Sequence, residues 1–162
     1  MKHFLGIEAI DDMHSWVREA RDLKKDPAAY SHLGKNKTLG LLFFNNSLRT
    51  RMSTQKAAFN LGLNPLVMNV GQDGWELEFE DGVIMNGASA EHIKEAAGVL
   101  GQYCDLIGVR AFAGLKDKEQ DEKDGVLNAL ATYSGIPVIN MESTLGHPLQ
   151  ALADAITIDE NK

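Results

Sequence analysis

A short stretch of hydroxyl and guanidinium side chains, Ser47-Leu48-Arg49-Thr50-Arg51, has the composition of an anion-binding turn. It follows the apolar run 38–44 and precedes a helical pattern, so free backbone N–H groups and the positive end of the helix dipole would point toward one spot. Ser47 and Thr50 add hydroxyls, and Arg49 adds a planar fork that matches two phosphate oxygens. The stretch predicts a phosphate site, although an ordinary helix capped by Ser47 would have the same sequence.

Four more polar side chains lie after other apolar runs of the chain. Arg110 ends the run 105–110, where a buried cation needs either a structural salt bridge or an anionic ligand. His147 precedes a proline at the expected start of a helix, where a histidine can serve as a cap or as a donor to a ligand. Glu142 follows the last apolar run as either a site residue or a solvated loop residue, and Gln150 lies three residues after His147.

The elements that would position these side chains alternate between strand and helix. Strands are expected at 38–44, 65–70, 105–110 and 137–141, and helices are expected to begin near residues 13, 47, 89, 126 and 148. Continuous apolar strands that alternate with helices predict an α/β fold, with a parallel sheet of about four strands flanked by helices in three layers. The carboxyl ends of parallel strands share one edge, so the polar residues above are expected to meet in one crevice.

Two connections are long for a compact domain, which is typical of functional loops. The first is 71–87 and contains Trp75; the second is 111–124 and is mostly charged. A tryptophan in such a loop packs either on its own domain or on a ligand.

The composition limits the classes of protein that the chain can be. With 162 residues, 44% hydrophobic and 24% charged, it is expected to form one globular domain. A net charge of −7 leaves no broad basic field for a nucleic-acid backbone. Cys104 is the only cysteine, which excludes a disulfide scaffold or a multi-cysteine zinc site. No apolar run is long enough for a signal peptide or a membrane span, so a cytoplasmic location is expected.

The order and spacing of the polar motifs resemble the carbamoyl-phosphate domain of the transcarbamylases, the aspartate/ornithine carbamoyltransferase family. SxRTR after an apolar strand, Arg110 at a strand end and His147-Pro148-Leu149-Gln150 at a helix start occur in that order, and the resemblance covers essentially the whole chain. Trp75 and the run 51–56 most resemble the branch that uses N-succinylornithine or N-acetylornithine. GxGxxG and GxxxxGK[ST] are both absent, so dinucleotide-binding and P-loop alternatives lose their main support.

The resemblance implies a carbamoyltransferase that needs no metal and no organic cofactor. Its substrates would be carbamoyl phosphate and an N-acylated ornithine, as in arginine biosynthesis, with no nucleic-acid or membrane partner. The implied carbamoyl-phosphate ligands are Ser47, Leu48 (through its N–H), Arg49, Thr50, Trp75, Arg110, His147 and Gln150. Thr50, Arg110 and His147 would be catalytic and surround the carbonyl oxygen, where each fixed donor can stabilise the tetrahedral intermediate by roughly 3 kcal/mol. Glu142 would contact the acylornithine, and Trp75 would reach into a neighbouring subunit of a homotrimer.

The chain departs from the family pattern in its length, because family members have a second α/β domain that binds the amino-acid substrate. Residues 1–162 are therefore expected to be the carbamoyl-phosphate-binding domain of a fragment or truncated product. Residues 148–162 would be the helix leading into the second domain, and the chain alone would have little or no activity. At position 90 glutamate would favour the acetyl substrate and proline the succinyl substrate; Ala90 has no carboxylate and so favours succinyl.

Two alternatives remain open at the sequence level. An ordinary ornithine or aspartate transcarbamylase domain would contain the same phosphate turn, but Trp75 argues against it. A non-catalytic phosphate-sensing module on a flavodoxin-like sheet would need carboxylates at its strand ends to hold magnesium. The strand ends contain Asn45, Asn46, Arg110 and Glu142 instead, a set with a single carboxylate, which argues against this alternative.

Overall fold

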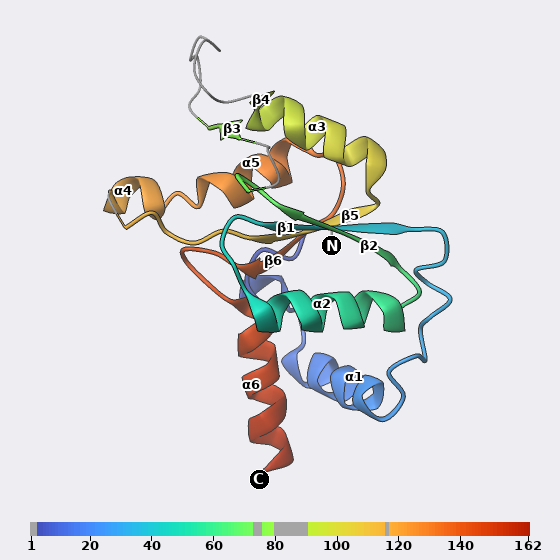
Figure 1. Ribbon diagram of the computed structural model, residues 1–162. Coiled ribbons are helices and arrows are strands. Elements are labelled where there is room, and N and C mark those ends of the chain that lie inside the picture. Colours follow the sequence, from blue (N-terminus) through green and yellow to red (C-terminus); the bar gives the residue numbers. More distant parts are fainter. Residues whose placement is uncertain (1–2, 73–75, 80–90, 116) are drawn as a thin grey trace.

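The computed structural model describes residues 3–72, 76–79, 91–115 and 117–162 (Figure 1). Its central sheet has four parallel strands in the order β2-β1-β5-β6. Their bounds are β1 Thr38–Phe43, β2 Asn64–Asn69, β5 Leu106–Arg110 and β6 Val138–Glu142. Each strand agrees with its expected range to within one residue at either end, so the predicted parallel α/β sheet is confirmed.

Helices cover both faces of this sheet. Their bounds are α1 Met13–Lys25, α2 Leu48–Asn60, α3 Ile93–Tyr103, α5 Gly125–Tyr133 and α6 Pro148–Glu160. Figure 1 shows α3 and α5 on one face and α2 with α1 on the other, while α6 runs away from the sheet beside α1. The three-layer arrangement expected from the sequence is therefore present. Shorter elements are the 3-10 turn η1 Ile7–Ala9, α4 Lys118–Asp121, and the paired strands β3 Leu77–Glu78 and β4 Glu91–His92.

The core explains why the strands are continuously apolar. Leu41 and Leu42 are adjacent in β1 and point to opposite faces, yet each is only 1% exposed. Leu42 packs with Leu130 and its neighbours under α3 and α5, whereas Leu41 packs with Ala58 under α2. A parallel strand buried on both faces has no polar side, so its sequence shows no alternation.

One helix start was predicted wrongly. The sequence predicts a helix start near residue 89; that residue lies outside the described residues, and α3 begins at Ile93. Its N-cap is His92, whose Nδ1 accepts the backbone N–H of Lys94 at 3.2 Å. An imidazole nitrogen satisfies a free N–H as a serine oxygen does, although serine is the commoner cap.

The single cysteine belongs to the core. Cys104 is the C-cap of α3 and is 6% exposed. Burial, together with the neighbouring Asp105 carboxylate, raises the pKa of the Cys104 thiol above its usual value. A thiol that is both buried and protonated is a poor nucleophile. Across the described ranges, no helix combines the length and the apolar character that crossing a bilayer requires.

Candidate functional site

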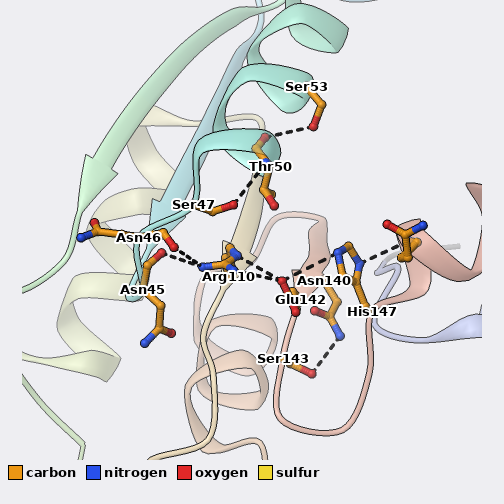
Figure 2. Close-up of polar contacts among 11 residues, drawn as sticks. Asn45, Asn46, Ser47, Thr50, Ser53, Arg110, Asn140, Glu142, Ser143 and His147 are labelled. Atoms are coloured by element: carbon orange, nitrogen blue, oxygen red, sulfur yellow. Dashed lines mark hydrogen bonds and ion pairs between the residues drawn. The ribbon is translucent and has the colours of Figure 1, made fainter.

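Arg110 is the buried centre of the polar cluster at the carboxyl edge of the sheet (Figure 2). It is the last residue of β5 and is 7% exposed. Its Nη1 donates to the carbonyls of Asn45 and Asn46, each at 2.9 Å, and its Nε and Nη2 lie 3.2 Å from Oε2 of Glu142. The Phe112 ring packs 4.1 Å from the guanidinium carbon. Arg110 thus joins the turn before α2 to the end of β6.

The N-terminus of α2 adjoins this cluster. Ser47 is its N-cap, and the Ser47 Oγ accepts the backbone N–H of Thr50 at 3.2 Å. The cap uses an oxygen lone pair and leaves the hydroxyl proton available to a ligand. Arg49 is exposed, and Leu48, with a 74% exposed side chain, contributes backbone N–H at the helix start. The α2 N-terminus therefore has the parts of an anion site, and Figure 2 shows Thr50 on the side of α2 that faces Arg110.

His147 is the N-cap of α6. Its Nδ1 accepts the backbone N–H of Gln150 at 3.2 Å, so in the neutral ring the proton lies on Nε2. Nε2 is 3.8 Å from Oε2 of Glu142. The Gln150 side-chain amide donates to Asp154 at 2.8 Å along the surface of the helix. Both the capping and the ligand interpretations of His147 are compatible with this geometry, because capping occupies Nδ1 and leaves Nε2 facing the cluster.

Glu142 connects the two donors. A single carboxylate oxygen, Oε2, lies near both Arg110 and the His147 ring, and the Glu142 side chain is 27% exposed. A partly exposed carboxylate can be displaced by a stronger anion, whereas the guanidinium remains anchored by its two carbonyls. The edge can therefore offer Arg110, His147 and the start of α2 to a phosphate-bearing ligand and polarise a carbonyl placed between them.

The two arginines of the SxRTR stretch have different environments. Arg51 donates to Asn69 at the end of β2, and its guanidinium lies 4.5 Å from the centre of the Phe43 ring. Arg51 is thereby bound to the sheet, while Arg49 extends from the first turn of α2 into solvent. Arg49 is therefore the arginine of the stretch whose exposed side chain can reorient to contact a ligand.

The structure brings together the predicted residues Arg110, Glu142 and His147, and it places Ser47 and Thr50 on the adjoining helix start. Trp75 and Ala90 lie outside the described residues. Among the residues that the structure describes, no group of three or more His, Cys, Asp or Glu side chains is arranged to hold a metal ion.

The roles of several residues at this edge were not predicted. The carbonyls that hold Arg110 belong to Asn45 and Asn46, and neither amide side chain signals that role. Asn140 is 2% exposed in β6 and donates to Oγ of Ser143 at 3.0 Å. The available signal was the amide of Asn140 in the otherwise apolar run 137–141, since a buried polar group needs a partner.

Replacing Ser47 with alanine is expected to lower the free energy of unfolding by about 1 kcal/mol, because the first turn of α2 loses its side-chain acceptor. Urea denaturation measures the change. Ser53→Ala is the matched control: Ser53 is an exposed serine on the same helix whose Oγ donates to the Thr50 carbonyl at 3.2 Å. Ser53→Ala should lower the free energy of unfolding by less than half as much as Ser47→Ala. Equal decreases would show that the Ser47 cap contributes no more than an ordinary surface hydrogen bond.

Comparisons with known proteins agree with one another. The family model "aspartate/ornithine carbamoyltransferase, carbamoyl-P binding domain" matches residues 2–160. N-succinylornithine carbamoyltransferase of Bacteroides thetaiotaomicron is 51% identical over 162 residues, which are 100% of this chain and 51% of that protein. N-acetylornithine carbamoyltransferase of Xanthomonas campestris pv. campestris is 44% identical over 167 residues, covering 99% of this chain and 47% of the relative.

A solved structure is also similar along the whole chain. It is a glutamate-to-alanine mutant of N-acetyl-L-ornithine transcarbamylase, complexed with carbamyl phosphate and N-succinyl-L-norvaline. The TM-score is 0.92 at 43% identity, and the match covers 99% of this chain and 48% of that one. The chain thus spans about half the length of the curated relatives and the solved structure that it matches.

Proposed function

The chain belongs to the aspartate/ornithine carbamoyltransferase family, as the carbamoyl-phosphate-binding domain, and from this premise we propose that it binds carbamoyl phosphate at the edge between α2 and α6. The observation that supports the proposal most directly is the convergence of Arg110, His147 and the N-terminus of α2 on one edge of the sheet. Three donors from three elements suit a ligand that bears both a phosphate and a carbonyl.

The proposed roles are those that the family resemblance implies, and the positions of these donors are compatible with them. Ser47, Arg49, Thr50 and the Leu48 N–H bind the phosphate, where the helix end adds to the charge of the arginine. Thr50, Arg110 and His147 donate to the carbonyl oxygen, and the Gln150 amide oxygen accepts from the carbamoyl amino group. No metal or organic cofactor takes part in this assignment.

The proposed reaction is carbamoyl transfer to the side-chain amine of an N-acylated ornithine, the step that the names of the relatives describe. The amine nitrogen forms a bond to the carbamoyl carbon, negative charge develops on the carbonyl oxygen, and the bond from carbon to the phosphate oxygen breaks. Fixed donors toward that oxygen each contribute roughly 3 kcal/mol to lowering the barrier. The amine proton leaves with the phosphate or to solvent, so charge and atoms balance.

The finer assignments rest on the same relatives. N-succinylornithine is favoured over N-acetylornithine, because the relatives at 51% and 50% identity use the succinyl substrate and Ala90 has no carboxylate. Glu142 contacts the acylornithine once carbamoyl phosphate has taken its place beside Arg110. The complete enzyme acts in arginine biosynthesis in the cytoplasm as a homotrimer, with Trp75 entering the site of a neighbouring subunit.

Calorimetric titration of the 162-residue chain with carbamoyl phosphate, beside its mass by light scattering, tests the proposal. We expect saturable binding at one site per chain in a particle of three chains, and weaker binding of inorganic phosphate, because phosphate alone leaves the carbonyl donors unused. Absence of saturable binding by a folded trimer would contradict the site. The acyl preference is measured separately, by assaying N-succinylornithine and N-acetylornithine with the full-length parent.

A further inference from the structure

Glu142 and His147 are separated by a turn of only four residues. The backbone N–H of Ser143 donates to the Gly146 carbonyl at 2.9 Å and closes the turn. Leu145 is 65% exposed, and a pocket of about 500 Å³ borders the turn from Ser143 to His147. The tip of the turn is exposed at Leu145 and Gly146, whereas Ser143 is buried, so the polar contacts of Ser143 and Thr144 are the ones that can fix the position of the turn.

The principal polar contact comes from Asp124, twenty residues away along the chain. Asp124 is the N-cap of α5, yet its carboxylate makes no hydrogen bond to its own helix. Oδ2 instead accepts the Ser143 hydroxyl at 2.6 Å, and Oδ1 accepts the Thr144 N–H at 3.0 Å. Its backbone has φ +47°, a left-handed conformation that costs a non-glycine residue roughly 1 kcal/mol. The residue thus accepts strain and leaves its helix uncapped while it holds the turn.

Asn140 completes the contacts from the other side. Its Nδ2 donates to the Leu5 carbonyl at 2.8 Å. The same Nδ2 donates to Oγ of Ser143 at 3.0 Å, a contact that Figure 2 shows. The Ser143 hydroxyl therefore accepts from Asn140 and donates to Asp124, which fixes the direction of its proton. A chain of hydrogen bonds with one direction restrains orientation as well as distance.

We propose that Asp124 is a positioning residue for His147: through Ser143 and Thr144 it holds the turn that sets the imidazole beside Glu142. The inference rests on the proposed function, because the value of a fixed imidazole lies in meeting the carbonyl of carbamoyl phosphate. When the carboxylate is removed, the turn gains freedom and the His147 ring samples orientations that do not face the ligand, which lowers affinity without removing any ligand contact.

Two substitutions at Asp124 separate positioning from folding. Asp124→Gly removes both hydrogen bonds and also relieves the positive φ, so its melting temperature should stay close to that of the wild type. Asp124→Asn tolerates the left-handed backbone, keeps an acceptor for the Thr144 N–H, and offers its amide N–H to Ser143 Oγ. Asp121→Ala is the control. The Asp121 carboxylate also accepts two backbone N–H groups, those of Gly114 at 2.7 Å and Leu115 at 2.9 Å, but in a different loop.

Carbamoyl-phosphate affinity is expected to fall about tenfold in Asp124→Gly and less than about threefold in Asp124→Asn and Asp121→Ala, as calorimetry measures. The imidazole ¹H–¹⁵N spectrum, with His147 assigned by comparison with His147→Gln, gives a second readout. The wild type should show one tautomer protonated on Nε2, and Asp124→Gly should show averaged signals.

Failure of the proposed function and failure of this inference give different results. If the wild-type chain does not bind carbamoyl phosphate, the proposed function fails, while the tautomer comparison still tests the positioning of His147. If Asp124→Gly leaves the His147 signals unchanged, or if it binds carbamoyl phosphate within twofold of the wild type, Asp124 does not position His147.

Discussion

Replacing Arg49 with alanine is expected to lower carbamoyl-phosphate affinity by at least about a hundredfold, since a charge-assisted pair with a phosphate is lost where the helix end cannot replace it. The free energy of unfolding should change by less than about 0.5 kcal/mol, because Arg49 is exposed in the first turn of α2 and the structure gives it no packing role. Arg49→Ala is thus expected to reduce carbamoyl-phosphate affinity strongly while leaving the free energy of unfolding nearly unchanged.

Calorimetric titration and urea denaturation of the same preparation measure the two effects. Lys56→Ala is the matched control: Lys56 is also exposed on α2 and carries the same charge, but it lies about two turns from the N-terminus of the helix. It should keep wild-type affinity to within about twofold, the size expected of a distant and screened charge. Equal losses from Arg49→Ala and Lys56→Ala would mean that α2 attracts the ligand only through its general charge.

The elements of this fold could be predicted from the sequence because burial on both faces leaves a local signature. Leu41 and Leu42 show it in β1, where adjacent residues are both apolar. Helix starts leave a separate local signal. Pro148 marks one, because a proline at the first helical position loses no backbone hydrogen bond. Parallel topology then assigns the carboxyl ends of the strands to one edge, so Arg110 and His147 were expected together before any distance was known.

The contacts within the edge could not be predicted, because they depend on distances between elements far apart in the chain. The SxRTR stretch predicts Arg49 as a phosphate ligand but does not show where the Arg51 side chain lies; the end of β2 supplies Asn69 as its partner. Asp124 has the sequence of an ordinary helix cap, and only the fold reveals that its carboxylate reaches Ser143 instead.

Glu142 illustrates the same limit for charge. The sequence left it as either a solvated loop residue or a ligand to the second substrate, and its pairing with Arg110 follows from the register of β5 and β6, in which the two residues are partners. That register includes a shift between Val109 and Arg110. A local shift of this kind brings the two side chains to one face, and no single-sequence pattern encodes it.

Replacing Arg110 with methionine is expected to remove carbamoyl-phosphate binding and also to destabilise the fold, in contrast to Arg49→Ala. Methionine preserves the contact with the Phe112 ring but leaves the carbonyls of Asn45 and Asn46 and the Glu142 carboxylate without their donor. Loss of the donor to these part-buried acceptors, discounted for their partial exposure, gives a decrease of about 1–3 kcal/mol in the free energy of unfolding. Urea denaturation at pH 7 measures it.

A second substitution, Glu142→Gln, identifies which group causes the loss of stability in Arg110→Met. If an uncompensated carboxylate causes much of it, Arg110→Met combined with Glu142→Gln should be more stable than Arg110→Met alone, which is a coupling that a double-mutant cycle isolates. Arg21→Met provides the surface comparison: Arg21 pairs with Asp159 at 2.8 Å, but both side chains are 40% exposed or more. Its loss should cost less than about 1 kcal/mol. A cost at Arg110 no larger than at Arg21 would show that the cluster is held by the backbone turns and that Arg110 serves the ligand alone.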